Sequence, residues 1–234
     1  MKYAMLLLFA VLITSSSAVA QTDCQSYFPF KNGATMEYGS YDKKGELQSQ
    51  ATHKITEVQS AGGALEATVE TNVTTNKKDA EPIAGKYKVR CQDNTIFMDM
   101  SSMLVGTQAT SAISNLEMTM TGDELQIPSK LTVGEALPDA TMQMKAASGG
   151  VNLVSMTIKM VNRKVEAKET LQTAAGSFEA YKITYQTETK MLGTKTIDCA
   201  IWYTNGVGMV KQESYDKKGK LESKMELLKF EKGK

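Results

Sequence analysis

The chain contains very little histidine, and this scarcity excludes several kinds of enzyme site. His53 is the only histidine among 234 residues, so neither an HExxH pair nor a zinc site with several imidazole ligands can form. The sequence also lacks a GxSxG nucleophile motif, a phosphate-binding glycine loop and a GxGxxG motif. His53 stands between Thr52 and Lys54, and we expect it to lie on a solvated strand face without a catalytic role. We therefore predict no enzyme activity, no catalytic residue, no metal and no cofactor.

An excess of charge of one sign is absent too. The chain has 27 lysine and arginine residues against 26 aspartate and glutamate residues, which gives a formal net charge of +1. Binding of nucleic acid needs a concentrated basic face, so we expect no nucleic-acid partner. The same balance gives no reason to expect adsorption to anionic lipid.

Long apolar runs are absent after residue 20. The run Tyr3–Ile13 is shorter than the roughly 20 residues that a helix needs to span a bilayer. It follows Lys2 and precedes Ala18–Ala20, which has the small-x-small pattern of a signal-peptidase site. We predict that residues 1–20 are a secretory signal peptide, that the chain has no membrane span, and that the exported protein is periplasmic or extracellular.

Cysteine is scarce as well, with three residues in the chain. We predict that residues 21–234 form one domain, and in an oxidising compartment two of its cysteines should pair. The spacing permits any pair among Cys24, Cys91 and Cys199. We favour Cys24–Cys91, because this bridge would tie down the mature N-terminus and stabilise the fold by about 4 kcal/mol through loop closure. The residues before Cys24 do not form a lipobox, so we do not expect it to be lipidated.

Alternation of apolar and polar side chains is the main structural pattern that the chain does show. Turn-forming residues recur about every ten positions, and the segments between them have a period of two, as in Met156, Ile158 and Met160. This pattern is typical of an antiparallel sheet with one buried face. We predict an all-β fold, an antiparallel meander of about ten to twelve strands curled into a barrel or half-barrel. Little helix is expected, with Ser101–Ser114 the one candidate for a short helix or lid.

One sequence repeat links the two ends of the chain. The stretch Ser40–Leu47 returns, with one substitution, as Ser214–Leu221. Aspartate at the first turn position and glycine at the fourth are typical of a type I turn followed by a bulge. One interpretation is that two separate hairpins use the same turn chemistry. The alternative is that the first and last hairpins lie side by side and close the sheet.

Methionine is unusually frequent, with 15 residues, several of them two positions apart. Residues two apart on a strand share a face, so these side chains would line one surface of the sheet. The residues concerned are Met118, Met120, Met142, Met144, Met156 and Met160. They could simply fill an irregular core, because methionine adapts to gaps, or they could line a concave site for an apolar or lipid-like ligand. A Cu(I) site is a third possibility, but the usual accompanying histidine is missing and Cys91 is the only nearby thiol.

Several segments together resemble a known family. They are Cys24–Gly33 (CQSYFPFKNG), Met36–Tyr38, Ser40–Gly45, Ala175–Ile183 and Trp202–Lys211. Their order resembles the exported TapB-like proteins of Bacteroidetes, a family built on a domain of unknown function. The resemblance implies an exported, β-rich protein with no established activity and no catalytic residues to carry over. Relatives often have cysteine where this chain has Ala180, which implies that Cys199 has lost its partner and that Cys24–Cys91 is the remaining bridge.

These observations lead to two predictions of function. The first is an exported, non-enzymatic protein that binds an apolar or lipid-like small molecule on the methionine-rich concave face. The alternative is a structural or protein-interaction module of the cell envelope, which would need no small ligand and would meet another envelope protein through its sheet edges or loops.

Overall fold

The computed structural model describes residue 24 and residues 27–77, 80–100 and 116–234. In this part of the chain there are thirteen β-strands and no α-helix. The strands are β1 (Thr35–Asp42), β2 (Leu47–Ala61), β3 (Ala64–Thr75), β4 (Ile83–Gln92), β5 (Thr95–Asp99), β6 (Glu117–Gly122), β7 (Glu124–Pro128), β8 (Ala140–Ser148), β9 (Val151–Thr173), β10 (Gly176–Lys190), β11 (Thr194–Thr204), β12 (Gly208–Tyr215) and β13 (Leu221–Glu231). The predicted signal peptide and the candidate helix at Ser101–Ser114 lie outside the described residues.

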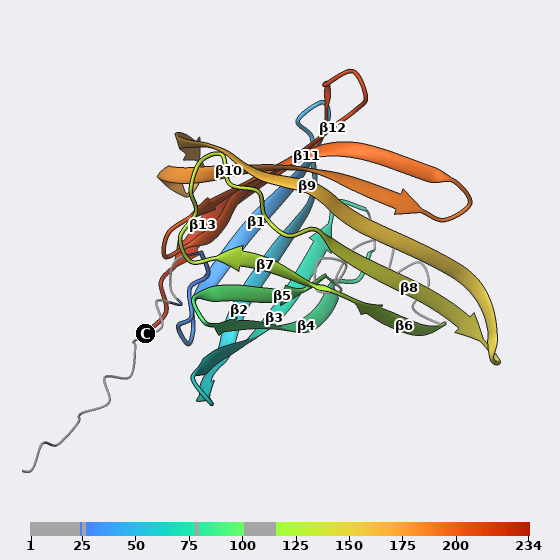
Figure 1. Cartoon of the computed structure of the whole chain (residues 1–234), viewed down its shortest axis with the longest axis horizontal. Helices are drawn as coiled ribbons and strands as arrows, with labels where there is room; N and C mark the ends of the chain where they lie inside the picture. Colours follow the sequence, from blue (N-terminus) through green and yellow to red (C-terminus); the bar gives the residue numbers. More distant parts are fainter. Residues whose placement is uncertain (1–23, 25–26, 78–79, 101–115) are drawn as a thin grey trace, which may run out of the picture.

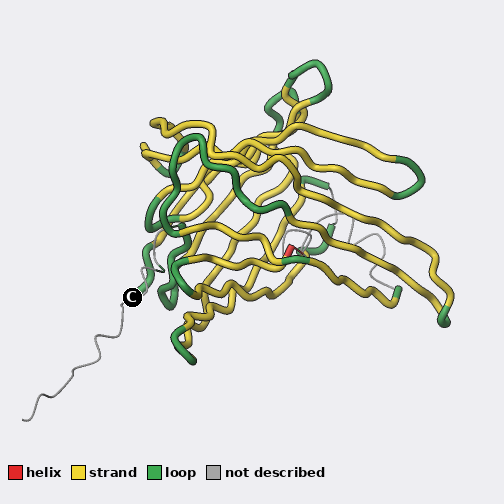
Figure 2. The backbone as a smooth tube through the Cα atoms, in the orientation of Figure 1, coloured by secondary structure: helices red, strands yellow, loops and turns green. Residues whose placement is uncertain are grey.

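All thirteen strands belong to one sheet, in the order β6-β8-β9-β10-β11-β12-β13-β1-β2-β3-β4-β5-β7. Most neighbours are consecutive in sequence and antiparallel, as in a meander. The sheet curls around a central axis into a nearly closed barrel (Figures 1 and 2). The predicted all-β fold is confirmed. The strand count exceeds the expectation because one continuous segment, residues 117–128, divides into β6 and β7 at Asp123.

This segment brings the two edges of the sheet together. Strand β6 pairs with β8 at one edge, and β7 pairs with β5 at the other. The corner at Asp123 is held by two hydrogen bonds to Thr141: the Asp123 N–H donates to the Thr141 carbonyl at 2.8 Å, and the Thr141 N–H donates to the Asp123 carboxylate at 2.9 Å. The two edge strands of the sheet are therefore joined covalently at this corner, which leaves the barrel nearly closed.

The repeated sequence forms two adjacent hairpins. Strands β1 and β13 pair with each other, so the β1–β2 and β12–β13 turns lie together at the top of Figure 1. In each turn the first aspartate accepts two backbone N–H groups, from residues two and four positions later. Gly45 and Gly219 complete the turns with φ of 81° and 73°, a conformation that glycine adopts without strain. Of the two interpretations of the repeat, the structure shows the alternative, in which the hairpins lie side by side, although the sheet does not close there, because β13 and β1 lie in the middle of the strand order.

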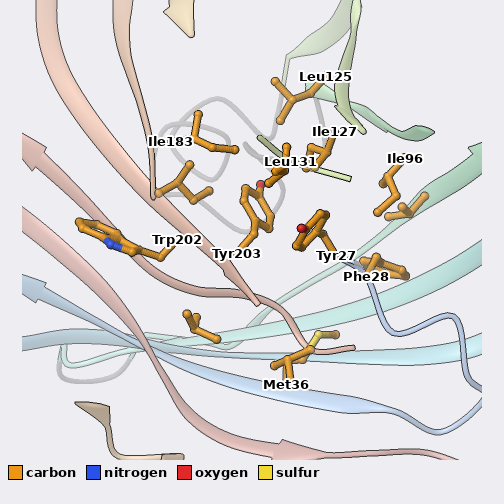
Figure 3. Packing of buried hydrophobic residues seen from close by; sticks show 14 of the residues in the cluster. Tyr27, Phe28, Met36, Ile96, Leu125, Ile127, Leu131, Ile183, Trp202 and Tyr203 are labelled. Atoms are coloured by element: carbon orange, nitrogen blue, oxygen red, sulfur yellow. The ribbon is translucent and has the colours of Figure 1, made fainter. Parts of the chain in front are cut away.

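The core lies at the end of the barrel opposite these turns. The segment that precedes β1 enters the barrel there and buries the aromatic rings of Tyr27 and Phe28 (Figure 3). Phe30 of the same segment is buried as well. These rings join inward-facing aliphatic residues of the sheet, such as Ile96 and Ile127. The Cys24–Cys91 disulfide fastens this segment to β4. The predicted pairing is confirmed, and Cys199 is free and buried.

Candidate functional site

The barrel contains a cavity of about 410 Å³ between the core and the paired turns. This volume lies in the range of about 300–1,000 Å³ that is common for small-molecule sites. Side chains from the N-terminal segment and from nine strands line it, mainly on the side of the barrel formed by β1 to β4 and β11 to β13. The cavity is therefore a feature of the barrel interior and does not depend on a single loop.

A continuous row of inward-facing residues surrounds the end of the cavity nearest the turns. The register of the strands joins them in the order Ile201, Gln212, Met225, Ser40, Ser49 and Thr75. We call the four polar members, Ser40, Ser49, Thr75 and Gln212, the polar rim. All four are half-buried, whereas the lining residues further inside, such as Met36 and Val73, are buried. Lining residues on β2 such as Ala51 and His53 are half-buried too, so the polar rim is defined by its place at the end of the cavity nearest the turns.

The inner part of the cavity is apolar and aromatic. The register places Tyr38, Ala51 and Val73 side by side directly inside the rim. Met36 lies further in, and Phe28 of the N-terminal segment also lines the cavity. The site thus changes from hydroxyl and amide groups at the end nearest the turns to hydrocarbon and rings further in, as small-molecule sites commonly combine the two.

His53 lines this cavity, so its predicted position on a solvated face is wrong. Its Nδ1 shares a hydrogen bond of 2.9 Å with the Tyr87 hydroxyl, and its ring meets Tyr38 edge-on at 5.4 Å between centroids. The neighbours Thr52 and Lys54 are exposed on the opposite face of β2. Three consecutive polar residues concealed the alternation, because a polar side chain at an inward position gives no hydrophobic signal.

The groups that line the cavity are uncharged at neutral pH. Loss of solvation lowers the pKa of His53 to about 4, so its ring is neutral. Burial raises the pKa of Tyr38 and Tyr87, and it raises the pKa of Tyr203 to about 12. No aspartate, glutamate, lysine or arginine is among the lining residues in the described part of the chain.

One rim hydroxyl has no partner. The Thr75 Oγ1 atom is buried and has no hydrogen bond within the described residues, and the same is true of Thr71, which is the cross-strand neighbour of His53. The Tyr38 hydroxyl, by contrast, donates to the Met209 carbonyl at 3.0 Å. Buried polar groups normally have a partner, so the Thr75 and Thr71 hydroxyls are exceptions in this part of the barrel.

The six predicted methionines lie elsewhere, on β6, β8 and β9. Met120, Met144 and Met156 are direct neighbours across these three strands. Met142, Met144 and Met160 are buried, whereas Met118 is 39% exposed. The structure brings the methionines together on one face, as the alternation indicates, but none of them lines the cavity. Ligand binding by this face stays a prediction.

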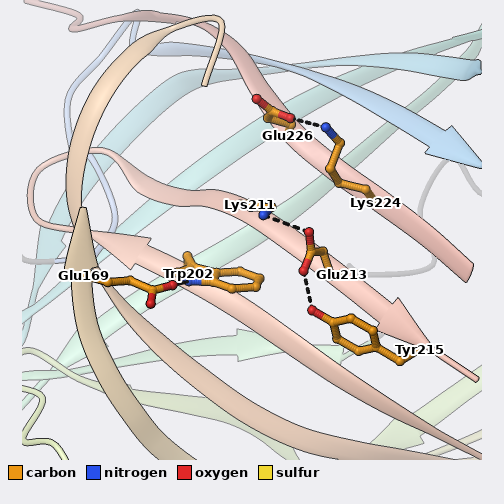
Figure 4. Close-up of polar contacts among 7 residues, drawn as sticks. All are labelled: Glu169, Trp202, Lys211, Glu213, Tyr215, Lys224 and Glu226. Atoms are coloured by element: carbon orange, nitrogen blue, oxygen red, sulfur yellow. Dashed lines mark hydrogen bonds and ion pairs between the residues drawn. The ribbon is translucent and has the colours of Figure 1, made fainter. Parts of the chain in front are cut away.

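A polar network covers the outer face of β11 to β13 (Figure 4). The Trp202 indole N–H donates to Glu169 at 2.5 Å, and the Lys211 ammonium lies 4.8 Å from the centre of the indole ring. Lys211 pairs with Glu213, which also accepts the Tyr215 hydroxyl. These groups satisfy one another. Across the described ranges no cluster of histidine, cysteine and carboxylate residues could hold a metal ion.

Comparison with known proteins shows which family has this architecture. Residues 31–227, which are most of the chain, match the family described as DUF3108-like. The chain belongs to the DUF3108-like family. Of the curated proteins, none matches. Two solved structures share the fold of this DUF3108-like chain and are fully covered by it.

The first of these structures is a candidate exported protein with a YmcC-like fold from Bacteroides fragilis, 21% identical over 89% of this chain, with a TM-score of 0.74. The second is a candidate lipoprotein from Parabacteroides distasonis, 23% identical over 89% of this chain, with a TM-score of 0.75. At these identities the likeness concerns the fold. In the described part of the DUF3108-like chain, the structure has no helix of the length and hydrophobicity needed to span a bilayer.

The buried His53 gives this DUF3108-like protein a predictable response to acid. An unfolded histidine titrates near 6.5 and the folded one near 4, so the unfolded chain binds more protons between these values. His53 should therefore lower the free energy of unfolding by about 3 kcal/mol as the pH falls from about 7 to about 3.5, with little further loss below that. Urea unfolding at several pH values, compared between the wild type and His53→Gln, isolates this contribution because the carboxylates are common to both. Parallel pH profiles for the two proteins would contradict the prediction.

Proposed function

We propose that this protein is an exported, non-enzymatic binding protein that takes up an apolar or lipid-like small molecule. The observation that carries the proposal is the cavity of about 410 Å³, whose interior is lined largely by apolar and aromatic side chains. Removal of an apolar molecule from water into such a site is favourable in proportion to the buried area. The nearly closed barrel holds the site open, because neighbouring strands from β7 through β1 to β11 are hydrogen-bonded in one continuous wall around it.

The environment of the lone histidine supports a non-enzymatic role. Within the described residues, His53 has one hydrogen-bond partner, the Tyr87 hydroxyl, and no carboxylate lies among the groups that line the cavity. A general base acts best with a pKa near the working pH, and the pKa of His53 is lowered to about 4. The family assignment is compatible with this proposal, and the narrower TapB-like assignment stays a prediction.

A neutral fluorescent probe, N-phenyl-1-naphthylamine, can test the proposal with two neighbouring variants. Ala51 points into the cavity, whereas Thr52 is exposed on the outer face of the same strand. We expect Ala51→Trp to fill the cavity and weaken probe binding at least about tenfold, because the indole occupies the space that the probe needs. Thr52→Trp should bind as the wild type does. Fluorescence titration measures both, and circular dichroism confirms that both are folded.

Three results would count against this assignment. Absence of probe binding by the wild type, together with no co-purifying lipid in native mass spectrometry, would contradict a binding function. Unchanged binding by Ala51→Trp would exclude the cavity as the site. Loss of binding in a Met118→Gln/Met156→Gln variant, but not in Ala51→Trp, would place the ligand on the methionine face.

A second candidate function, a protein-interaction module of the envelope, is favoured by one observation. The β10–β11 hairpin ends in Met191 and Leu192, which are 55% and 100% exposed, and Val151 and Leu153 are exposed at the start of β9. Exposed apolar side chains at projecting tips are typical of contact sites. A pull-down from envelope extract with the wild type and with Leu192→Ser would identify a partner that depends on this tip.

A further inference from the structure

We propose that the cavity selects amphiphiles whose polar end is uncharged and excludes long-chain carboxylates. This inference rests on the proposed function, because it specifies the chemical class of the molecule that enters the same site. The polar end would lie at the polar rim, and the hydrocarbon would extend inward past Tyr38 and Ala51 toward Met36.

The first support is the absence of a counter-charge. No charged side chain lines the cavity in the described part of the chain. Transfer of an ionised carboxylate out of water is strongly unfavourable unless a cation or several hydrogen bonds compensate. A hydroxyl or amide has a far smaller desolvation penalty, which a single hydrogen bond can offset. The lining therefore discriminates by charge even between two ligands that have the same hydrocarbon chain.

The second support is the chemistry of the polar rim. Serine and threonine hydroxyls both donate and accept hydrogen bonds, and the glutamine side chain offers a carbonyl and an amide group. The Gln212 amide donates to the Tyr185 hydroxyl at 3.2 Å, which fixes its orientation. Ser40 and Ser49 supply two half-buried hydroxyl side chains in the same rim. Such a mixed, neutral set of donors and acceptors complements an alcohol or an amide, which also has both.

The charged residues next to the rim in sequence are not available to a ligand. Lys211 and Glu213 flank Gln212 on β12, so they point to the outer face, where they pair with each other at 2.7 Å. Lys224 and Glu226 flank the lining residue Met225 on β13 in the same way and pair at 2.5 Å. The alternation of the strands thus keeps these cations outside the cavity.

Arg163 is the one buried cation among the described residues, and it does not serve the cavity either. It is 3% exposed and is not among the lining residues. Its Nη1 group donates to the Pro138 carbonyl at 2.5 Å, and its Nη2 group donates to the Gln126 carbonyl at 3.0 Å. These bonds hold the guanidinium against β7 and the segment that follows it, and the Nε group has no partner within the described residues. Because Arg163 is not a lining residue, it is not part of the polar rim.

Displacement of N-phenyl-1-naphthylamine by 1-dodecanol and by dodecanoate at pH 7.5 tests the inference, because the two competitors share one chain length. We expect 1-dodecanol to displace the probe at a concentration at least about tenfold lower than dodecanoate. Gln212→Lys places a cation at the rim and should lower the dodecanoate-to-dodecanol ratio at least about tenfold. Ser40→Lys provides a second rim variant if the first does not fold. Thr52→Lys adds the same charge to the outer face and should leave the ratio unchanged.

The possible results separate this inference from the proposed function. If the probe does not bind, both fail. If the probe binds and dodecanoate displaces it as well as 1-dodecanol does, the binding function stands and the selection of uncharged ligands is wrong. A probe that neither competitor displaces, or a ratio that changes equally in Thr52→Lys and the rim variants, would also overturn the inference.

Discussion

Replacement of Cys24 and Cys91 by alanine should lower the free energy of unfolding by about 4 kcal/mol. The bridge joins residues separated by 67 positions, and loss of so long a cross-link returns much conformational entropy to the unfolded chain. Loss of the bridge also frees the N-terminal segment, whose Tyr27 and Phe28 rings are buried in the core. Urea unfolding followed by circular dichroism, with the double variant and the wild type at the same pH, measures the difference.

The third cysteine supplies the control for this experiment. Cys199 is buried and unpaired, so Cys199→Ala should change the stability by about 1 kcal/mol or less, as a small change of buried volume does. A reducing agent should destabilise the wild type and Cys199→Ala alike, and leave the double variant unaffected. Equal unfolding midpoints for the wild type and the double variant would show that the bridge contributes nothing to stability.

Gly122→Ala should destabilise the protein by about 3 kcal/mol, because no side chain fits at this corner. A Cβ atom at Gly122 would lie 2.3 Å from the Thr141 carbonyl oxygen and 2.7 Å from the Met142 Cα atom. Both are backbone atoms, so relief of the clash must separate β6 from β8. Thermal and urea unfolding of the variant measure the loss.

Gly193 provides a matched glycine for comparison. A Cβ there meets no atom within 4 Å, and its φ lies outside the left-handed region. Gly193→Ala should therefore leave the stability within about 0.5 kcal/mol of the wild type. If Gly122→Ala proved as stable as Gly193→Ala, the close approach of β6 to β8 at this corner would be refuted.

The sequence predicts the class of fold well, because period-two alternation is a local property of each strand. The Met156–Met160 segment shows it directly, and the all-β architecture follows. The division of residues 117–128 between two sheet edges could not be predicted in this way. It depends on the Asp123 corner and on contacts with β8 and β5, which no local pattern records.

The candidate site was harder to predict, for a related reason. Methionine is conspicuous in composition, so the alternation on β6, β8 and β9 drew the prediction to those strands. The cavity instead lies behind Met36, Tyr38 and Ser40 on β1, which alternate equally well, and behind His53, whose polarity hides its inward position. The same period of two could have identified β1 as a lining strand, but only the strand register shows which rows surround an empty volume.

The pairing of β1 with β13 has a consequence for how the protein is made. Strand β1 cannot complete its hydrogen bonds until residues 221–231 have been synthesised, so the barrel cannot finish folding while the chain is still emerging. Contacts between such distant segments form slowly, and the incomplete sheet exposes its apolar inner surface meanwhile. A polypeptide that stays incompletely folded for this long needs protection from aggregation, and we expect its dependence on chaperones to end only once the C-terminal hairpin has been synthesised.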